Sequence, residues 1–396
     1  MRDSDSFVHI TDNSQLQEFC ERSYESEIIG FDTEFVSENR YRPELCLIQV
    51  ATDTEIAIID TMSVNELSPF WKLLTTGDQI TVVHAAREEF LFCFRGCQAR
   101  PKKMFDIQLA SGFIGLDYPA SYGNLVSQLL GISISKGETR TDWKRRPLSD
   151  NQIAYAIGDV EHLHQLYFNI FELLQKADRD GWYYQEVDTW LDNLQNAEID
   201  PQWHRISGAL RLNRRSLAVL RELWILRDSI AASKDRSPKR VIPDDLLVEL
   251  AKRGSSRPSN FKSIRGFDKR VAKGLTDAIA DAIKTANELP DNKLPQRLER
   301  GKSVNLGLVG QFLSTILGVV CRTQRIAPSL VGTVQDVRNL AAWRLGQLPK
   351  KPVPKLASGW RADIVGDVIG HAIDGKVALR VEDANSDHPL ALEKLD

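Results

Sequence analysis

The chain has 396 residues, of which 42% are hydrophobic and 27% charged, and its formal net charge is −3. This composition is that of a soluble globular protein, and the length predicts two or three domains. The N-terminus shows no apolar signal segment and no stretch is long enough to span a bilayer, so we expect no membrane segment. The five cysteines are odd in number and lack metal-ligand spacing, which predicts free thiols, largely buried, in a reducing cytoplasm.

The small net charge hides a division between the two halves of the chain. Residues 1–195 carry 17 basic and 31 acidic side chains, whereas residues 196–396 carry 34 and 23. The positive excess lies within 205–302. An acidic half joined to a basic half suggests metal chemistry in the first and polyanion binding in the second. Basic residues that only decorate helical surfaces explain the second half about as well.

The first 115 residues alternate short strands with helices. We expect strands at 28–36, 45–51, 55–60 and 80–84, and helices at 13–22, 64–75, 86–95 and 104–115. Because only a short turn separates the second and third strands, these two should form an antiparallel hairpin. A mixed sheet flanked by helices follows.

Two carboxylates one residue apart lie on the first expected strand. Successive strand side chains point to opposite faces, so Asp32 and Glu34 share one face and Thr33 takes the other. An acidic pair of this kind is usually the solvated side of a strand. Here the neighbouring residues indicate a buried strand, where unpaired charge is costly, so the pattern favours a bound cation.

A long helical run from 149 to 174 carries a second pair of polar side chains. Tyr155 and Asp159 are four residues apart and therefore lie on the same helix face. Alone, this pair is ordinary surface chemistry. The polar segment 131–148 before it predicts a loop whose basic cluster either decorates the surface or lies near a phosphate backbone.

After about residue 176 strand patterns disappear and helical periodicity dominates. Prolines and glycines divide the rest into two all-helical units, about 205–288 and 300–385, joined by a polar segment that begins at Pro290. An x-Gly element at Gly266 and at Gly366 suggests that the two units are a diverged repeat.

Several motifs occur in a fixed order along the chain: FDTEF at 31–35, LCLIQVA at 45–51, HAAREEF at 84–90, RTDW at 140–143 and YAIGDV at 155–160. In this order they resemble the ribonuclease D branch of the four-carboxylate exonucleases. The span 208–284 is similar to the helicase-and-RNase-D C-terminal (HRDC) domain. The resemblance implies an α/β, ribonuclease H-like exonuclease domain with a mixed central sheet at 1–200, an HRDC domain at 205–288 and a diverged HRDC-like domain at 300–385.

The resemblance also implies a function. The expected activity is 3′→5′ removal of nucleoside 5′-monophosphates from the single-stranded 3′ tails of structured, tRNA-type RNA, by a monomer. Two divalent ions, Mg²⁺ or Mn²⁺, would be held by Asp32, Glu34, Glu89 and Asp159. Tyr155 would orient the attacking water, because a phenol with a pKa near 10 is a poor base at neutral pH.

Further residues carry weaker expectations. Thr33, His84, Arg140 and Arg145 are the candidate substrate contacts, although Thr33 is equally expected as a plain strand residue and His84 as a structural histidine. Asp106 is expected to cap the helix that follows it.

One position departs from the family pattern, which has an aspartate where this chain has Glu89. The extra methylene moves the carboxylate by roughly one carbon–carbon bond, although Mg²⁺ can keep water between itself and a ligand. Two alternatives therefore stay open. One is an RNA-binding protein with a degenerate nuclease site, and the other is a 3′→5′ exonuclease that acts on DNA.

Overall fold

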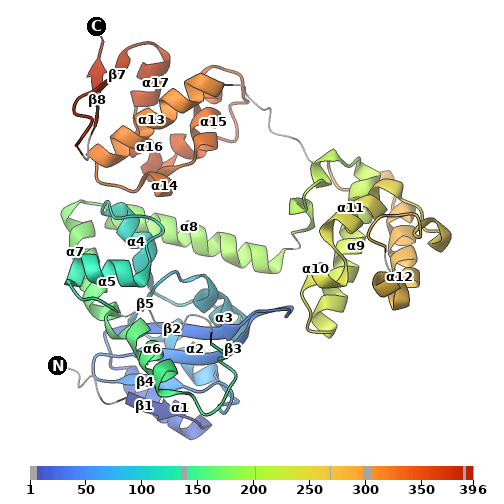
Figure 1. Cartoon of the computed structure of the whole chain (residues 1–396), viewed down its shortest axis with the longest axis horizontal. Coiled ribbons are helices and arrows are strands. Elements are labelled where there is room, and N and C mark those ends of the chain that lie inside the picture. The colour runs from blue at the N-terminus through green and yellow to red at the C-terminus, as the bar shows by residue number, and fades with distance from the viewer. Residues whose placement is uncertain are drawn as a thin grey trace.

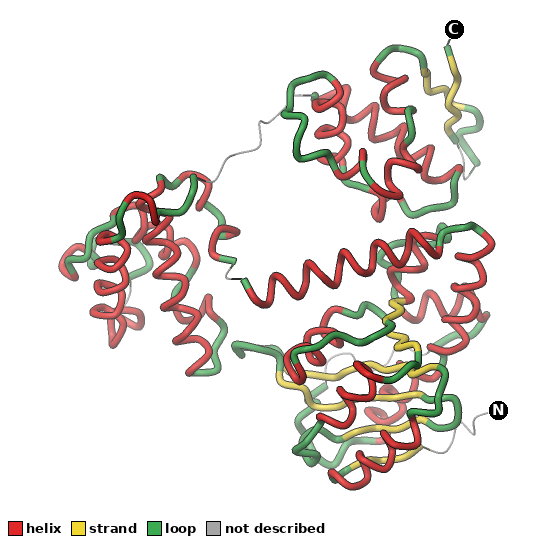
Figure 2. The backbone as a smooth tube through the Cα atoms, turned by 180° about the vertical axis from the view of Figure 1, so that it is seen from behind, coloured by secondary structure: helices red, strands yellow, loops and turns green. Residues whose placement is uncertain are grey.

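The computed structural model describes residues 7–134, 141–200, 202–267, 269–297, 306–386 and 389–395. All the strands of the larger sheet lie in the N-terminal part (Figure 1). The long helix α8 (Asp180–Ile199) runs from that part below one group of helices and toward a second group. Figure 2 shows the same division from behind, with a small second sheet near the C-terminus. No helix in the described ranges is long and apolar enough to cross a membrane.

The N-terminal part alternates strands and helices. Its strands are β1 (Phe7–Ile10), β2 (Ile28–Val36), β3 (Glu44–Ala51), β4 (Ile56–Ile59), β5 (Ile80–Val83) and β6 (Met104–Asp106). Its helices before α8 are α1 (Asn13–Ser23), α2 (Ser68–Thr76), α3 (Arg87–Cys97), α4 (Ile107–Phe113), α5 (Tyr122–Leu130), α6 (Asp150–Glu161) and α7 (Leu163–Lys176).

The six strands form one mixed sheet in the order β1-β4-β3-β2-β5-β6. β2 pairs antiparallel with β3 and β3 with β4, whereas β1–β4, β2–β5 and β5–β6 are parallel. The expected mixed sheet and its antiparallel hairpin are therefore confirmed. β2 lies near the middle of the sheet, which is why its apolar residues from Ile28 to Phe31 are buried, whereas Phe35 and Val36 at its end are half-buried.

Helices cover both faces of β2. On one face, a Cβ at Gly30 would lie 3.0 Å from Leu163, so α7 can pack this closely only over a glycine. On the other face, the rings of Phe31 and Phe70 meet edge to face at 5.7 Å, which places α2 there. Because side chains alternate along a strand, the α7 face is also the face of Asp32 and Glu34.

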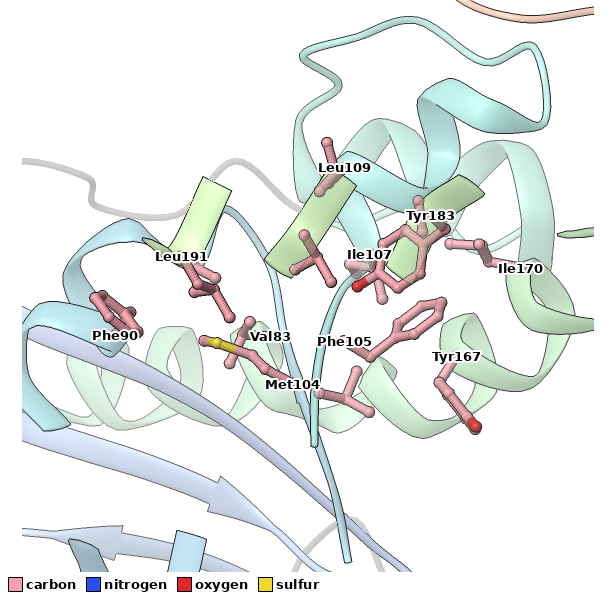
Figure 3. Packing of buried hydrophobic residues seen from close by; sticks show 14 of the residues in the cluster. Val83, Phe90, Met104, Phe105, Ile107, Leu109, Tyr167, Ile170, Tyr183 and Leu191 are labelled. Atoms are coloured by element: carbon pink, nitrogen blue, oxygen red, sulfur yellow. The ribbon is translucent and has the colours of Figure 1, made fainter. Parts of the chain in front are cut away.

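An aromatic cluster ties the sheet edge to α7 and α8 (Figure 3). Tyr183 is fully buried, its ring lies 4.7 Å from that of Phe105, and its hydroxyl accepts a hydrogen bond of 2.8 Å from the backbone N–H of Asp106. α8 is thereby fixed to β6 by both packing and a satisfied polar contact.

The first helical unit comprises α9 (Arg214–Ser233), α10 (Pro238–Val241), α11 (Asp244–Arg253) and α12 (Lys269–Glu288), with 3-10 turns at Trp203–Arg205, Ala209–Arg211, Pro258–Asn260 and Asp291–Lys293. Its buried side chains form a core of their own. Polar contacts link it to the β2–β3 connection: Tyr41 Oη donates to Asp228 at 2.8 Å, and Arg40 pairs with Asp235.

The second helical unit comprises α13 (Gly307–Thr323), α14 (Pro328–Val331), α15 (Val334–Arg344), α16 (Gly359–Val365) and α17 (Val368–Ile373), with a 3-10 turn at Lys355–Ala357. Unlike the first, it shares its hydrophobic core with the N-terminal part. The Trp360 ring lies 4.8 Å from that of Phe113. The Arg361 guanidinium forms a bidentate ion pair with the Glu186 carboxylate at 2.6 and 2.7 Å.

Some of the secondary-structure elements expected from the sequence differ from those in the structure. The second helical unit is not all-α, because β7 (Val377–Val381) and β8 (Leu390–Lys394) form an antiparallel hairpin. The expected helix 104–115 begins as strand β6, and the run 149–174 is two helices that meet at His162. β1 and α5 were not expected. All five cysteines are free thiols, and of these only Cys97 is half-buried rather than buried.

Candidate active site

Three carboxylates converge at the middle of the sheet. One oxygen from each of Asp32, Glu34 and Asp159 lies within 4.8 Å of the others, and all three residues are half-buried. β2 supplies the first two and α6 the third. A register shift between β2 and β3 directly after Glu34 bends the strand at the end of this site.

The segment before α6 positions the helix over the sheet. Ser149 and Gln152 form a capping box that starts α6. Just before it, Arg146 donates to both oxygens of the buried Asp60 at 2.6 and 2.7 Å, which anchors the segment to the end of β4. The Trp143 ring lies 6.0 Å from that of Tyr155. The residues 141–148 are therefore a scaffold for the helix face that bears Tyr155.

Burial and mutual repulsion raise the proton affinity of the cluster. Burial raises the pKa of Asp32 to about 7. Burial, followed by the charges of Asp32 and Asp159, raises the pKa of Glu34 to about 8, and burial with the Asp32 charge raises the pKa of Asp159 to about 8. A cation that neutralises the cluster would lower these pKa values, so the electrostatics favour a bound metal.

Tyr155 lies one helical turn before Asp159, close enough that the Asp159 charge acts on its phenol. Burial, and then the charges of Asp159, Glu34 and Asp32, raise the pKa of this phenol above its usual value. The hydroxyl therefore stays protonated at neutral pH and acts as a hydrogen-bond donor.

Glu89 lies outside the three-carboxylate cluster. It is buried in the first turn of α3, and its carboxylate accepts a hydrogen bond of 2.7 Å from the Thr33 hydroxyl. Burial, followed by the charge of Asp32, raises its pKa well above the usual value. Thr33 and Glu89 thus form a buried pair on the opposite face of β2 from Asp32.

The remaining expected contacts have different surroundings. His84 Nε2 lies 2.9 Å from the carbonyl oxygen of Ala120, and burial lowers the pKa of its imidazole. Arg145 is exposed, and Arg140 lies outside the described residues. Asp106 caps α4 through the N–H groups of Gln108 and Leu109, as expected.

Sequence reasoning missed two residues beside the cluster. Tyr122 packs its ring on His84 at 5.8 Å, accepts a hydrogen bond from the His162 N–H, and has its pKa raised by burial, then by the nearby Asp159 and Asp32. Gln49 is directly opposite Asp32 in the β2–β3 register. It is fully buried, and neither its amide nitrogen nor its amide oxygen has a hydrogen-bond partner among the described residues. A glutamine inside a buried strand was the available signal.

The donor set fits a hard divalent cation. Asp32, Glu34 and Asp159 offer only oxygen ligands, which Mg²⁺ and Mn²⁺ prefer, and no histidine or cysteine joins the cluster among the described residues. The orphaned amide of Gln49 beside Asp32 is also suited to orient a ligating carboxylate, because such carboxylates are commonly hydrogen-bonded in turn.

Comparisons with known proteins agree with this geometry. A family model described as 3′-5′ exonuclease matches residues 7–175, and the HRDC domain model matches residues 216–283. The chain is 33% identical over 384 residues to ribonuclease D of Gluconacetobacter diazotrophicus, with 95% of both chains covered. It is 32% identical over 382 residues to ribonuclease D of Sphingobium indicum, covering 94% of this chain and 96% of that one. Escherichia coli RNase D has the same fold, with a TM-score of 0.80 at 23% identity over 93% of this chain and 99% of that one.

The fold and the carboxylate cluster thus define a metal-dependent 3′→5′ exonuclease domain followed by HRDC-type helices. With this identity over nearly its whole length, the chain belongs to the ribonuclease D family and is a hydrolytic 3′→5′ exoribonuclease.

Proposed function

We propose that the chain trims the 3′ ends of structured, tRNA-type RNA one nucleotide at a time and releases nucleoside 5′-monophosphates. The observation that carries this proposal is the convergence of Asp32, Glu34 and Asp159 within 4.8 Å, with Tyr155 one helical turn before the third. The Escherichia coli RNase D of the same fold is described as an exoribonuclease involved in structured RNA processing, which supports the substrate class.

We assign two divalent ions, Mg²⁺ or Mn²⁺, to Asp32, Glu34 and Asp159 together with Glu89. Two such ions, when bound, activate a water and stabilise the leaving 3′ oxygen of an in-line displacement. Glu89 would contribute through an intervening water or after turning away from the Thr33 hydroxyl, because Mg²⁺ readily keeps water in its coordination shell.

The chain's own side chains would then position the reactants. Tyr155, protonated at neutral pH, would donate to the attacking water and hold it in line with the scissile bond. The Thr33 backbone and His84 would contact the terminal nucleotide, and Arg140 and Arg145 would meet backbone phosphates without reading sequence. A monomeric state and a cytoplasmic location remain predictions from the sequence.

One assay tests the proposal. The purified chain is incubated with 5′-labelled single-stranded RNA, the same sequence as DNA, and a tRNA precursor with a 3′ tail, in Mg²⁺, Mn²⁺ or EDTA. We expect a ladder of products shortened from the 3′ end on both RNAs, release of nucleoside 5′-monophosphates and complete inhibition by EDTA. Binding of RNA without any shortening in either metal would favour the degenerate RNA-binding protein, and faster shortening of the DNA would favour the DNA exonuclease.

A further inference from the structure

A polar cavity lies where the second helical unit meets the exonuclease part. Its volume is about 520 Å³, and it is lined by the α4–α5 connection, Gly115 to Pro119, and by residues between Arg322 at the end of α13 and Ser329 in α14. In Figure 1 α14 lies above α4, where the second helical unit meets the exonuclease part. The cavity is separate from the carboxylate cluster, and no role assigned so far uses it.

Two arginines give the cavity its charge. The side chains of Arg322 and Arg325 are exposed, and within the described ranges neither guanidinium forms an ion pair or a hydrogen bond. The opposing charge in the cavity wall is Asp117, which is also exposed and unpaired there. The buried Arg361 of the same junction is, by contrast, engaged with Glu186. Arg322 and Arg325 are thus free to bind an anionic ligand.

The walls of the cavity are held firmly in place. Arg179 donates to the carbonyl oxygens of Phe113, Gln324 and Arg325, and so ties the turn after α13 to the end of α4. The Ala327 N–H donates to the Gly112 carbonyl at 2.8 Å. At Gly115, where φ is +88°, a Cβ would lie 2.9 Å from the Arg325 carbonyl oxygen, so only glycine permits this approach. A site with fixed walls loses little entropy when it binds a ligand.

A short stretch of chain connects the cavity to the active site. Ala120 directly follows the cavity wall, and its carbonyl oxygen lies 2.9 Å from His84 Nε2. Tyr122 lies close enough to Asp159 and Asp32 that their charges raise the pKa of its phenol. Tyr122 beside the cluster follows Tyr118 in the wall by four positions, so their Cα atoms are at most about 14 Å apart. The nearest wall of the cavity therefore lies within about 14 Å of a residue beside the carboxylates, a span that a short RNA strand can cover.

We propose that this cavity binds a backbone phosphodiester of the RNA upstream of its 3′ end, through Arg322 and Arg325. The proposal rests on the proposed function, and it assigns to the second helical unit a direct share in substrate binding. Arginine suits this task because its planar guanidinium donates two parallel hydrogen bonds to phosphate oxygens.

The test varies the length of the substrate. The full chain and the double variant Arg322→Gln/Arg325→Gln are given single-stranded oligoribonucleotides from a dinucleotide to about twelve nucleotides. The longest of these lies within the roughly 4–16 nucleotides that single-strand sites cover. All carry a 5′ hydroxyl, so that only internal phosphodiesters can fill the cavity. We expect the KM of the variant to rise about tenfold or more for the long substrates, the scale of one or two charge-assisted hydrogen bonds. The kcat, and the hydrolysis of the dinucleotide, should not change.

Two further variants make the result specific. Lys350→Gln/Lys351→Gln removes the same charge from exposed positions of the same helical unit outside the cavity lining and should leave KM unchanged. Asp117→Asn removes the opposing charge and should lower KM for long RNA only. In EDTA, the slope of log K against log salt should fall by about 1 for each lost phosphate contact.

The failure of this proposal differs from the failure of the proposed function. An equal loss on dinucleotide and long RNA, an equal loss in the lysine control, or RNA affinity in EDTA identical to that of the unaltered chain would overturn the cavity assignment. If the unaltered chain hydrolyses no RNA of any length, the proposed function fails, and the affinities measured in EDTA still decide whether the cavity holds RNA.

Discussion

The two faces of strand β2 carry acids in different settings. On the α6 face, Asp32 and Glu34 meet Asp159 and have no basic partner in the cluster, so their pKa values rise to about 7 and 8 through burial and repulsion. On the other face, Glu89 is buried against Thr33 and accepts a hydrogen bond from its hydroxyl. The carboxylates of the α6 face are thus arranged to bind a cation, whereas the carboxylate on the other face is hydrogen-bonded to a protein hydroxyl. Substitutions on the two faces should therefore change activity and metal dependence in different ways.

The largest effect is expected on the α6 face. Asp32→Asn and Asp159→Asn each remove a ligand charge at nearly unchanged volume, so we expect kcat to fall by about 10³-fold or more while RNA binding in EDTA remains. Single-turnover hydrolysis of a labelled RNA, with binding measured by fluorescence anisotropy, checks both. Turnover within a few-fold of the unaltered chain in either variant would contradict the assignment of these carboxylates to the metal site.

Tyr155→Phe should have a smaller effect on the same face. The ring keeps its packing against Trp143 and only the hydroxyl is lost, so we expect a fall of about 10²-fold in the single-turnover rate. The apparent affinity for Mg²⁺ should change little, because the charge of the cluster is kept. An unchanged rate would leave Tyr155 with a structural role only.

The other face is tested at Glu89. Glu89→Gln keeps a group that can accept a hydrogen bond from Thr33 but loses the carboxylate charge. We expect Mg²⁺-dependent activity to fall about 10- to 100-fold, the effect typical of residues that support the metal ligands from outside the coordination shell. Glu89→Asp should retain or raise activity, because it restores the family's shorter acid. Equal activity in the chain and both variants would show that Glu89 is no part of the metal site. Activity only in Glu89→Asp would identify the natural chain as the RNA-binding protein.

Gln49 allows a comparison of stability with metal binding. Gln49→Met replaces a fully buried amide without partners by an apolar side chain of similar shape, so the melting temperature in EDTA should rise. The Mg²⁺ midpoint of activity should also rise, about tenfold, if the amide orients Asp32, whereas kcat at saturating metal should recover. A higher melting temperature with an unchanged midpoint would mean that the amide plays no part in metal binding.

The sequence predicted the parts of the site that depend on local periodicity. The alternation of a strand places Asp32 with Glu34, and the turn of a helix places Tyr155 with Asp159, so both pairs followed from spacing alone. The contact between Thr33 and Glu89 depends on how α3 packs on β2, which no local pattern encodes. Residue-by-residue roles in catalysis stay predictions.

At the level of the fold, the central hairpin and mixed sheet were predicted, but short elements were not. β6 has three residues and leads directly into the helix capped by its last residue, Asp106, so the segment reads as one helix. The β7 segment VALRV does carry a strand signal, which the helical pattern around it masked. The sharing of one core between the second helical unit and the exonuclease part, through Trp360 and Phe113, is a long-range property.

The smallest effect concerns stability against pH without metal. In the folded chain the pKa values of Asp32, Glu34 and Asp159 are about 7, 8 and 8, whereas unfolded carboxyl groups have values near 4. Between these limits the folded state binds more protons than the unfolded state. The contribution of these three carboxyl groups to stability is therefore present at low pH and is lost as pH rises through the folded pKa values. We expect the melting temperature in EDTA to fall between about pH 5 and about pH 8, and Mg²⁺ to reduce this fall because it binds the ionised cluster. Asp32→Asn, which cannot ionise, should melt at a higher temperature than the unaltered chain at pH 8 and show a shallower dependence, whereas the exposed control Asp117→Asn should follow the unaltered chain. Identical profiles for all three proteins would show that neither burial nor repulsion penalises ionisation of the acids on the α6 face, and the contrast between the two faces of β2 would then rest on geometry alone.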